Sequence, residues 1–403
     1  MKRMPHLTAT IISLIVMTMA LIGFNYYAQA LEQRDVNALA PLNLPQAING
    51  SALQRAALSK SDLLPIFGSS EITLNANPYQ AEKFFAAYPT GFTVFNVAKE
   101  GASSLTMAQD LAALGPALKG RRVVISITPT LFTYGDELEE YYIGNYSRLH
   151  AYELILSPYL SMRLKSAAAQ RMLNHPKTLQ SDPLIQFTLN HMADNSIQSQ
   201  ILYDMIWPLG EFQTEVMRLQ DHAEVVLYIR SHHIDPNVQH ISQKIDWASD
   251  FSDALTEEKM HTLSNPYGIE DSIWEDSQIR TEVLPSIPGS SDPKFLQFLQ
   301  MAKEWPDFEI LLDVLQELGA KPLILSRPIN ARFWEAVGVS EQAQSVYYVK
   351  LHAVVDPYHM TLVDYRQYAD DIYFSTDKFS HTSRYGWIYV DQTLDEFFHG
   401  NLH

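Results

Sequence analysis

Two serines stand directly after a short apolar run, at a place where many α/β proteins hold a nucleophile. The run Leu63–Phe67 is typical of a strand, and Gly68, Ser69, Ser70 and Glu71 follow it. Reactive groups of open α/β sheets lie in the turns after the carboxyl ends of the strands. A helix that began there would bring its positive N-terminal end to an anionic intermediate. The segment therefore predicts a serine nucleophile, although Gly-Ser-Ser also occurs in ordinary turns.

An acid and a histidine near the other end of the sequence could activate such a serine. Asp377 precedes His381 by four positions, and the last helix is predicted over Tyr385–Phe398. A carboxylate fixes the tautomer of an imidazole, whose second nitrogen can then accept the proton of a serine hydroxyl. The order serine, aspartate, histidine is known from triads on α/β folds. Such an Asp–His pair also occurs in surface loops.

The densest group of histidines does not predict a metal site. Pro236 lies between His233 and His240, so no single helix could turn His232, His233 and His240 toward one metal ion. The chain has no cysteine, which excludes disulfides, thiolate zinc sites, iron–sulfur clusters and a cysteine nucleophile. We therefore expect neither a metal nor another cofactor.

The charge of the chain limits its partners. The 403 residues include 29 Lys and Arg against 46 Asp and Glu, a formal net charge of −17. This excess argues against nucleic acid, because few basic groups remain to neutralise phosphates. It would suit a cationic substrate, although a solvated acidic surface has the same composition. At roughly 150 residues per domain, the length allows two to three domains or one large α/β domain with insertions.

The N-terminal stretch is apolar enough for a membrane helix, for which about 20 residues are needed. Lys2 and Arg3 precede the apolar run, and residues 7–27 could stay in the membrane as a signal anchor. Alternatively, Ala28–Ala30 is the cleavage site of a secretory signal. Both interpretations place the rest of the chain outside the cytoplasm.

From Ser61 onward, strands and helices alternate. Strands are predicted at Leu63–Phe67, Thr93–Val97 and Val123–Ile127, and helices at Pro78–Ala87 and Leu105–Leu114. Strands about 30 residues apart with helices between them imply right-handed crossovers and a mainly parallel sheet.

The middle of the chain lacks this alternation. Residues 135–293 are rich in Leu, Met and Gln at helical spacing, which predicts a helical insertion with one strand-like run at Val225–Ile229. The α/β pattern returns with a helix over Lys294–Leu318 and a strand over Pro322–Ser326. The expected organisation is a cytoplasmic N-terminus at 1–6, a membrane helix at 7–27, a linker at 28–60 and one extracytoplasmic domain at 61–403.

Five segments in chain order resemble blocks of the DltD family of D-alanyl-lipoteichoic acid biosynthesis proteins, membrane-anchored relatives of the SGNH hydrolases. Gly68–Glu71 resembles the family's GSSE block, and Ser126–Phe132 resembles its SPQWF segment. The others are Asn96–Ser104, similar to a glycine-bearing block, Ser326–Trp334, similar to MPVNGKWY, and His381 with Gly386–Asp391, similar to H…GWVYVD. The resemblance covers about residues 60–135 and 295–400 and the N-terminal helix.

The resemblance implies a fold and a site. The fold would be an SGNH- or flavodoxin-like three-layer α/β/α domain with a central parallel sheet, a helical insertion and an N-terminal transmembrane helix. Ser70 would be the nucleophile, His381 the general base and Asp377 the residue that orients the base. The backbone N–H groups of Ser70 and Gly101, together with Thr130, would form the oxyanion hole.

Two departures from the family pattern affect this site. Three residues separate the acid from the histidine where the family has two, and Lys378 stands where the acid is expected. A one-residue bulge would be needed to bring Asp377 to the imidazole. Thr130 replaces a Gln and reaches less far, and the loss of one oxyanion donor raises a barrier by roughly 3–4 kcal/mol.

The function that the resemblance implies is D-alanine transfer to (lipo)teichoic acid at the outer face of the cell membrane, by serine-based acyl transfer or ester or thioester cleavage. The implied partners are a D-alanyl donor and a teichoic acid acceptor, with a D-alanyl carrier protein and a membrane O-acyltransferase as further candidates. Two alternatives stay open. One is an SGNH-type O-acyltransferase or esterase for an exported polysaccharide, and the other is an inactive scaffold that binds a carrier protein or a membrane acyltransferase.

Overall fold

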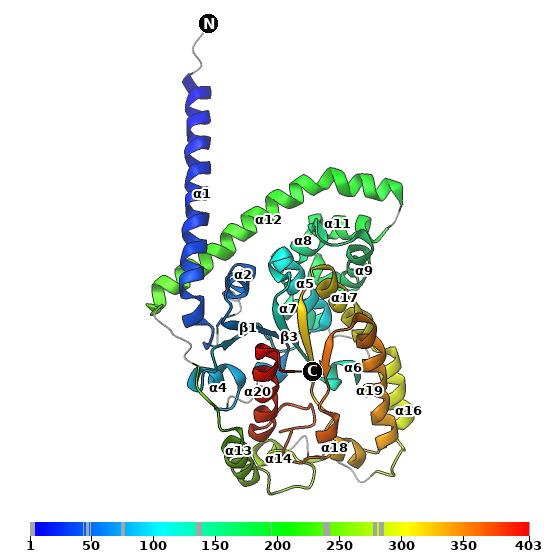
Figure 1. Cartoon of the computed structure of the whole chain (residues 1–403). Coiled ribbons are helices and arrows are strands. Elements are labelled where there is room, and N and C mark those ends of the chain that lie inside the picture. The colour runs from blue at the N-terminus through cyan, green and yellow to red at the C-terminus, as the bar shows by residue number, and fades with distance from the viewer. Residues whose placement is uncertain are drawn as a thin grey trace.

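A five-stranded parallel sheet forms the centre of the computed structural model, in the order β2-β1-β3-β4-β5 (Figure 1). The strands are β1 Leu63–Phe67, β2 Thr93–Asn96, β3 Arg122–Ile127, β4 Lys321–Ser326 and β5 Thr361–Val363. The structure describes residues 5–42, 44–45, 48, 50–73, 77–133, 139–194, 196–236, 242–276, 280–281 and 286–402. The prediction of an α/β fold with a central parallel sheet is confirmed.

The central strands form because they are apolar on both faces, as strands of a covered parallel sheet are. All five residues of β1 are buried, and in β3 and β4 only the first residue is exposed. The register pairs β3 with β4 over their whole length, from Arg122 with Lys321 to Ile127 with Ser326. The carboxyl ends of these strands therefore lie at one edge of the sheet.

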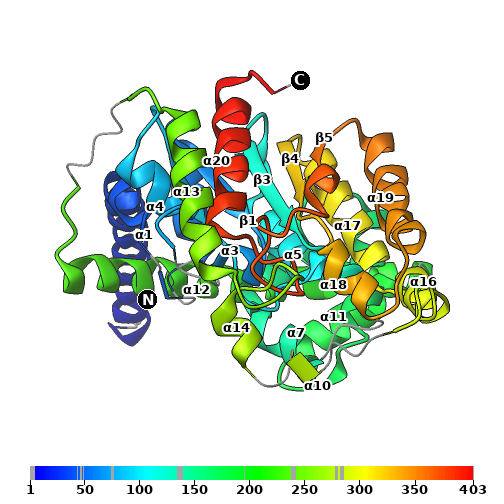
Figure 2. The same cartoon turned by 90° about the horizontal axis from the view of Figure 1, so that it is seen from below.

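Helices cover both faces of the sheet and complete three layers (Figure 2). Leu64, Val94 and Leu323 point to the face that is covered by α4 (Ala81–Ala87), α13 (Trp247–His261) and α20 (Arg384–His399). Phe67, Ile125 and Ile324 point to the opposite face, where α2 (Ser51–Ser59), α5 (Ser104–Leu114) and α17 (Glu304–Glu317) pack. Each sheet face thus has its own apolar core.

The segment expected as an insertion is helical wherever the structure describes it, apart from loops and an isolated bridge. Its helices are α7 Glu139–Asn145, α8 Arg148–Leu156, α9 Met162–Met172, α10 Pro176–Leu179, α11 Pro183–Ala193, α12 Ile197–His232, α13 and α14 Asp271–Glu275. The strand predicted at Val225–Ile229 is wrong, because these residues lie within α12. Val225, Val226 and Ile229 are buried at helical spacing on the side that faces the domain.

Two further differences from the predicted elements occur elsewhere in the chain. The helix expected over Lys294–Leu318 is divided into α16 (Asp292–Met301) and α17, with a break at Ala302 and Lys303. The helices α3 Ser70–Thr73, α6 Pro129–Thr133, α18 Ala331–Ala336 and α19 Glu341–Val355 and the strand β5 were not among the predicted elements.

The first helix is longer than the predicted membrane segment. The helix α1 runs over Pro5–Leu39, and by length and composition its apolar part could cross a membrane. Its exposed half projects away from the domain in Figure 1, whereas Ala28, Leu31 and Val36 are buried in the domain core. Much of the stretch expected as a linker at 28–60 is therefore helical and packed, in the last turns of α1 and in α2.

Candidate active site

The strand order has a switch point between β1 and β3. The connection from β1 leads to β2 on one side of β1, and the next connection leads to β3 on the other side. Ligand sites of open α/β sheets lie at such a switch point, outside the carboxyl ends of the strands. Ser70 begins the short helix α3 that follows β1, and Thr130 lies in α6, directly after β3. The fold thus places both predicted site residues at the edge where chemistry is expected.

Ser70 and His381 are 311 positions apart in sequence and in contact in the structure. Nε2 of His381 lies 3.0 Å from Oγ of Ser70. The residue His381 is only 7% exposed, whereas Ser70 is partly exposed. A reactant could therefore reach the hydroxyl from solvent while the base stays protected. The distance of 3.0 Å between Nε2 of His381 and Oγ of Ser70 is short enough for proton transfer from a serine nucleophile.

Asp377 reaches the imidazole in spite of the extra residue. Its Oδ2 forms a short hydrogen bond with Nδ1 of His381, and its Oδ1 accepts the backbone N–H groups of Phe379 at 2.8 Å and His381 at 3.1 Å. Ser380 takes up the additional length with a left-handed backbone, φ 67°. The loop from 377 to 381 thus wraps around the carboxylate of Asp377. It forms the one-residue bulge that the longer spacing between Asp377 and His381 requires.

Two side chains from distant motifs hold this loop in place. Nδ2 of Asn330 donates to the carbonyl of Asp377 at 3.2 Å, and Oγ1 of Thr130 donates to the carbonyl of Phe379 at 3.1 Å. The hydroxyl of Thr130 is therefore engaged by the loop, which differs from the expected role as an oxyanion donor. The arrangement instead supports a positioning role for Thr130.

Gly101 lies in the loop after β2, at the same edge of the sheet. Its backbone has φ 75°, and a Cβ at this position would stand 2.7 Å from Cδ1 of Tyr141. The backbone N–H of Lys99 donates to the carbonyl of Gly68 at 3.2 Å, which ties this loop to the turn that precedes Ser70. A side chain is disfavoured at Gly101 both by the left-handed backbone and by the tyrosine ring.

The surroundings of His381 change its basicity. Burial lowers the pKa of the imidazole, but the hydrogen bond and charge of Asp377, together with the charge of Glu71, outweigh burial and raise that pKa above 6.5. Opposite charges favour the protonated form of a histidine. The base is therefore better able to hold the proton that it would take from Ser70.

A buried guanidinium lies behind the site and was missed in the sequence. Arg327 follows β4, is fully buried and has no hydrogen-bond partner for its guanidinium among the described residues. Its Cζ lies 4.9 Å from the ring centroid of Trp387, a cation–π contact. Burial lowers the pKa of Arg327, and the positive charge of Arg327 in turn lowers the pKa of His381. The position of Arg327, a charged residue directly after a buried strand, could have indicated this group in the sequence.

A second missed group is the carboxyl of Asp391, on the sheet-facing side of α20. Neither of its oxygens has a hydrogen-bond partner in the described part of the chain. Burial, followed by the negative charge of Glu82, raises the pKa of Asp391 well above 3.8. The positive charge of Arg327 opposes this shift, so the two buried groups interact electrostatically.

A cavity of about 350 Å³ lies at the end of α3, three residues beyond Ser70, and no triad residue is part of its lining. It is lined by Thr73 at the end of α3, by Lys99 and Glu100 after β2, and by Tyr141 and Asn145 from α7. Nδ2 of Asn145 donates to the carbonyl of Glu100 at 3.0 Å and so fixes one wall. The cavity combines a cation with carboxylates, which suits a ligand that carries both charges.

The histidine group shows no metal geometry in the described residues. His232 stacks on Tyr228 at the end of α12, and His233 caps that helix with a left-handed backbone, while His240 lies outside the described residues. No group of three or more potential metal ligands occurs within the described ranges.

The sheet topology and the Ser70–His381–Asp377 contacts define an α/β protein with the geometry of a serine triad. The model of the DltD protein family matches residues 43–399, so the chain belongs to the DltD family. Protein DltD of Bacillus subtilis (strain 168) is 25% identical over 357 residues, 88% of this chain and 87% of that protein. Protein DltD of Staphylococcus aureus (strain NCTC 8325 / PS 47) is 22% identical over 403 residues, 98% of this chain and 96% of that protein.

Proposed function

We propose that this chain transfers or cleaves D-alanyl groups at the outer face of the cell membrane, as a serine enzyme of the SGNH type. Membership of the DltD family connects the chain with the D-alanylation of teichoic acids. The observation that carries the enzymatic part is the continuous contact from Ser70 through His381 to Asp377. An inactive scaffold would have no need to keep three such groups in register.

The proposed first step forms an acyl-serine. Oγ of Ser70 attacks the carbonyl carbon of a D-alanyl ester or thioester while its proton moves to Nε2 of His381, and Asp377 stabilises the imidazolium. Backbone N–H groups of Ser70 and Gly101 would stabilise the negative charge on the carbonyl oxygen. The bond to the leaving alcohol or thiol then breaks, and His381 returns the proton to that group.

The second step transfers the acyl group. A hydroxyl of the teichoic acid, or water in the hydrolytic case, attacks the acyl-serine and gives its proton to Nε2 of His381, which passes it to Ser70. The charges that line the cavity at the end of α3 are compatible with this assignment. Lys99 offers a positive charge to a phosphate of the polymer, and Glu100 and Glu140 offer negative charges to the ammonium group of D-alanine.

The test in cells measures the D-alanine content of teichoic acid. A strain that lacks this chain is complemented with the wild-type protein, Ser70→Ala or the control Ser69→Ala. Wild type and Ser69→Ala should restore D-alanine, and Ser70→Ala should leave it at the level of the deletion strain. Full restoration by Ser70→Ala would favour the scaffold. Unchanged D-alanine in the deletion strain would redirect the enzyme to another exported polymer.

We further propose that residues 7–27 remain in the membrane as an uncleaved anchor, with the domain outside the cytoplasm. Ala28 is buried within α1, and the residues that follow it continue the helix into the core. A signal peptidase would have to unwind the helix at Ala28–Ala30, where Ala28 packs against the domain while Gln29 and Ala30 are exposed. We expect sequencing of the mature N-terminus to show a start ahead of the apolar run. A start at Leu31 would show that the anchor is removed.

A further inference from the structure

The helix α12 presents an apolar face to the outside of the domain. Its exposed apolar side chains recur every three or four residues, and Met205 and Phe212 are 73% and 68% exposed. The stripe consists of Ile197, Ile201, Met205, Leu209, Phe212 and Val216. An exposed apolar surface of this extent marks a contact with another apolar phase or partner.

The orientation of this stripe is fixed by the opposite side of the helix. The hydroxyl of Tyr203 donates to the carbonyl of Ile155 at 2.9 Å, and Oγ1 of Thr214 is buried against the domain. Gly210 lies so close to α8 that a Cβ there would stand 2.9 Å from Cδ1 of Leu156. The helix cannot rotate its apolar stripe inward without losing these contacts.

The anchor helix fixes where the stripe lies. Nδ1 of His222 is 2.7 Å from Oε1 of Glu32, and Nε of Arg230 donates to the hydroxyl of Tyr27 at 2.9 Å. Figure 1 shows that α12 crosses the lower part of α1 and extends along the side of the domain from which the exposed half of α1 projects. A bilayer around that exposed half would meet the stripe.

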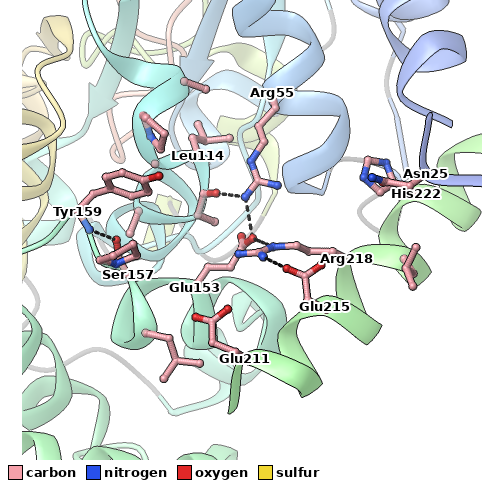
Figure 3. A pocket seen from close by; sticks show the side chains of 18 of the residues that line it. Asn25, Arg55, Leu114, Glu153, Ser157, Tyr159, Glu211, Glu215, Arg218 and His222 are labelled. Atoms are coloured by element: carbon pink, nitrogen blue, oxygen red, sulfur yellow. Dashed lines mark hydrogen bonds and ion pairs between the residues drawn. The ribbon is translucent and has the colours of Figure 1, made fainter. Parts of the chain in front are cut away.

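The space between α1 and α12 has no excess of positively charged side chains. A cavity of about 550 Å³ lies there, and in it Arg55 and Arg218 both bind Oε1 of Glu153, at 2.6 and 2.7 Å (Figure 3). Glu211 and Glu215 also line it, and no Lys or Arg occurs between Ile197 and Met217. A helix that adheres to anionic lipid is basic. A contact between lipid and the stripe at 197–216 would therefore be apolar.

We propose that the α12 stripe inserts into the outer leaflet of the bilayer and holds the domain against the membrane surface. The proposal rests on the membrane anchor proposed above and adds a second attachment. One helix leaves a domain free to tilt, whereas two non-parallel helices fix its orientation. The catalytic edge would then keep a constant direction relative to the membrane.

The absence of cysteine makes a direct depth measurement possible. Four single-cysteine variants of the full chain, Val16→Cys, Met205→Cys, Phe212→Cys and Leu263→Cys, are labelled with a small fluorophore and reconstituted in vesicles of neutral phosphatidylcholine with brominated acyl chains. Val16 reports the anchor. Leu263 is the matched control, because it is 75% exposed but follows α13, which lies far from the projecting half of α1 in Figure 1.

We expect bromine to quench the labels at 205 and 212 several-fold more than the label at 263, in low and high salt alike. Quenching at 16 alone would overturn the inference and leave the anchor in place. Absence of quenching at 16 would overturn the anchor and this inference together. Quenching at 205 and 212 that needs anionic lipid would contradict the apolar contact.

Discussion

Replacement of Ser70 by alanine is expected to abolish the turnover of a small chromogenic ester by the full chain in detergent. The change removes the only atom within 3.0 Å of Nε2 of His381 that could attack a carbonyl among the described residues. In serine enzymes, loss of the nucleophile or of the base alone lowers kcat by roughly 10⁶-fold. His381→Ala should therefore be as inactive as Ser70→Ala, and the double variant should be no worse.

The control for this prediction is the neighbouring serine. Ser69 is buried, and its backbone N–H donates to Oε1 of Glu71 at 2.9 Å, a bond that an alanine also makes. Ser69→Ala should therefore keep most of the turnover. Full activity of Ser70→Ala together with an inactive Ser69→Ala would show that the nucleophile is Ser69 and not Ser70.

The change Asp377→Asn is expected to lower kcat by about 10⁴-fold, because the amide no longer stabilises the imidazolium or the required tautomer. Turnover needs neutral His381, so the rate of the wild type should rise with pH through the raised pKa of His381. The hydrogen bond and charge of Asp377 raise that pKa, so their loss should move the acidic limb of the pH–rate profile to lower pH. Steady-state kinetics across pH measure both effects.

A charge change in the same loop separates this effect from general electrostatics. Lys378 is adjacent to Asp377 and stands where the family pattern expects the acid. Lys378→Gln removes a positive charge near His381, which would slightly raise the pKa of His381. Any shift of the acidic limb should therefore be small and toward higher pH. If Asp377→Asn keeps both the rate and the limb of the wild type, Asp377 does not orient the base.

The strands predicted from the sequence are those that are almost wholly buried. β1 and β3 consist almost entirely of apolar residues, and their pattern needs no tertiary information. β5 has only three residues, lies at the edge of the sheet and is partly accessible, so its pattern carries no clear signal. Val225–Ile229 is rich in β-branched residues, but packing against the domain retained it in α12.

The site was predictable to the extent that it depends on chain order. Ser70 and His381 follow from the turn after the first strand and from the position of an acid–histidine pair before the last helix. The left-handed Ser380 and the bond from Thr130 to Phe379 depend on contacts across the fold, which no local pattern encodes. The same holds for Arg327, whose pKa is influenced by Glu71 of α3 and Asp391 of α20.

The most direct measurement of the central claim, an activated Ser70, is covalent capture by a serine-directed phosphonate, with the adduct located by peptide mass spectrometry. A stable bond from Oγ to phosphorus forms only where a base removes the proton of the hydroxyl. We predict one adduct on the peptide that contains Ser70, retained in Ser69→Ala, strongly slowed in His381→Ala and absent in Ser70→Ala. A wild-type chain that stays unlabelled, or an adduct that persists in Ser70→Ala, would contradict the assignment of Ser70 as an activated nucleophile.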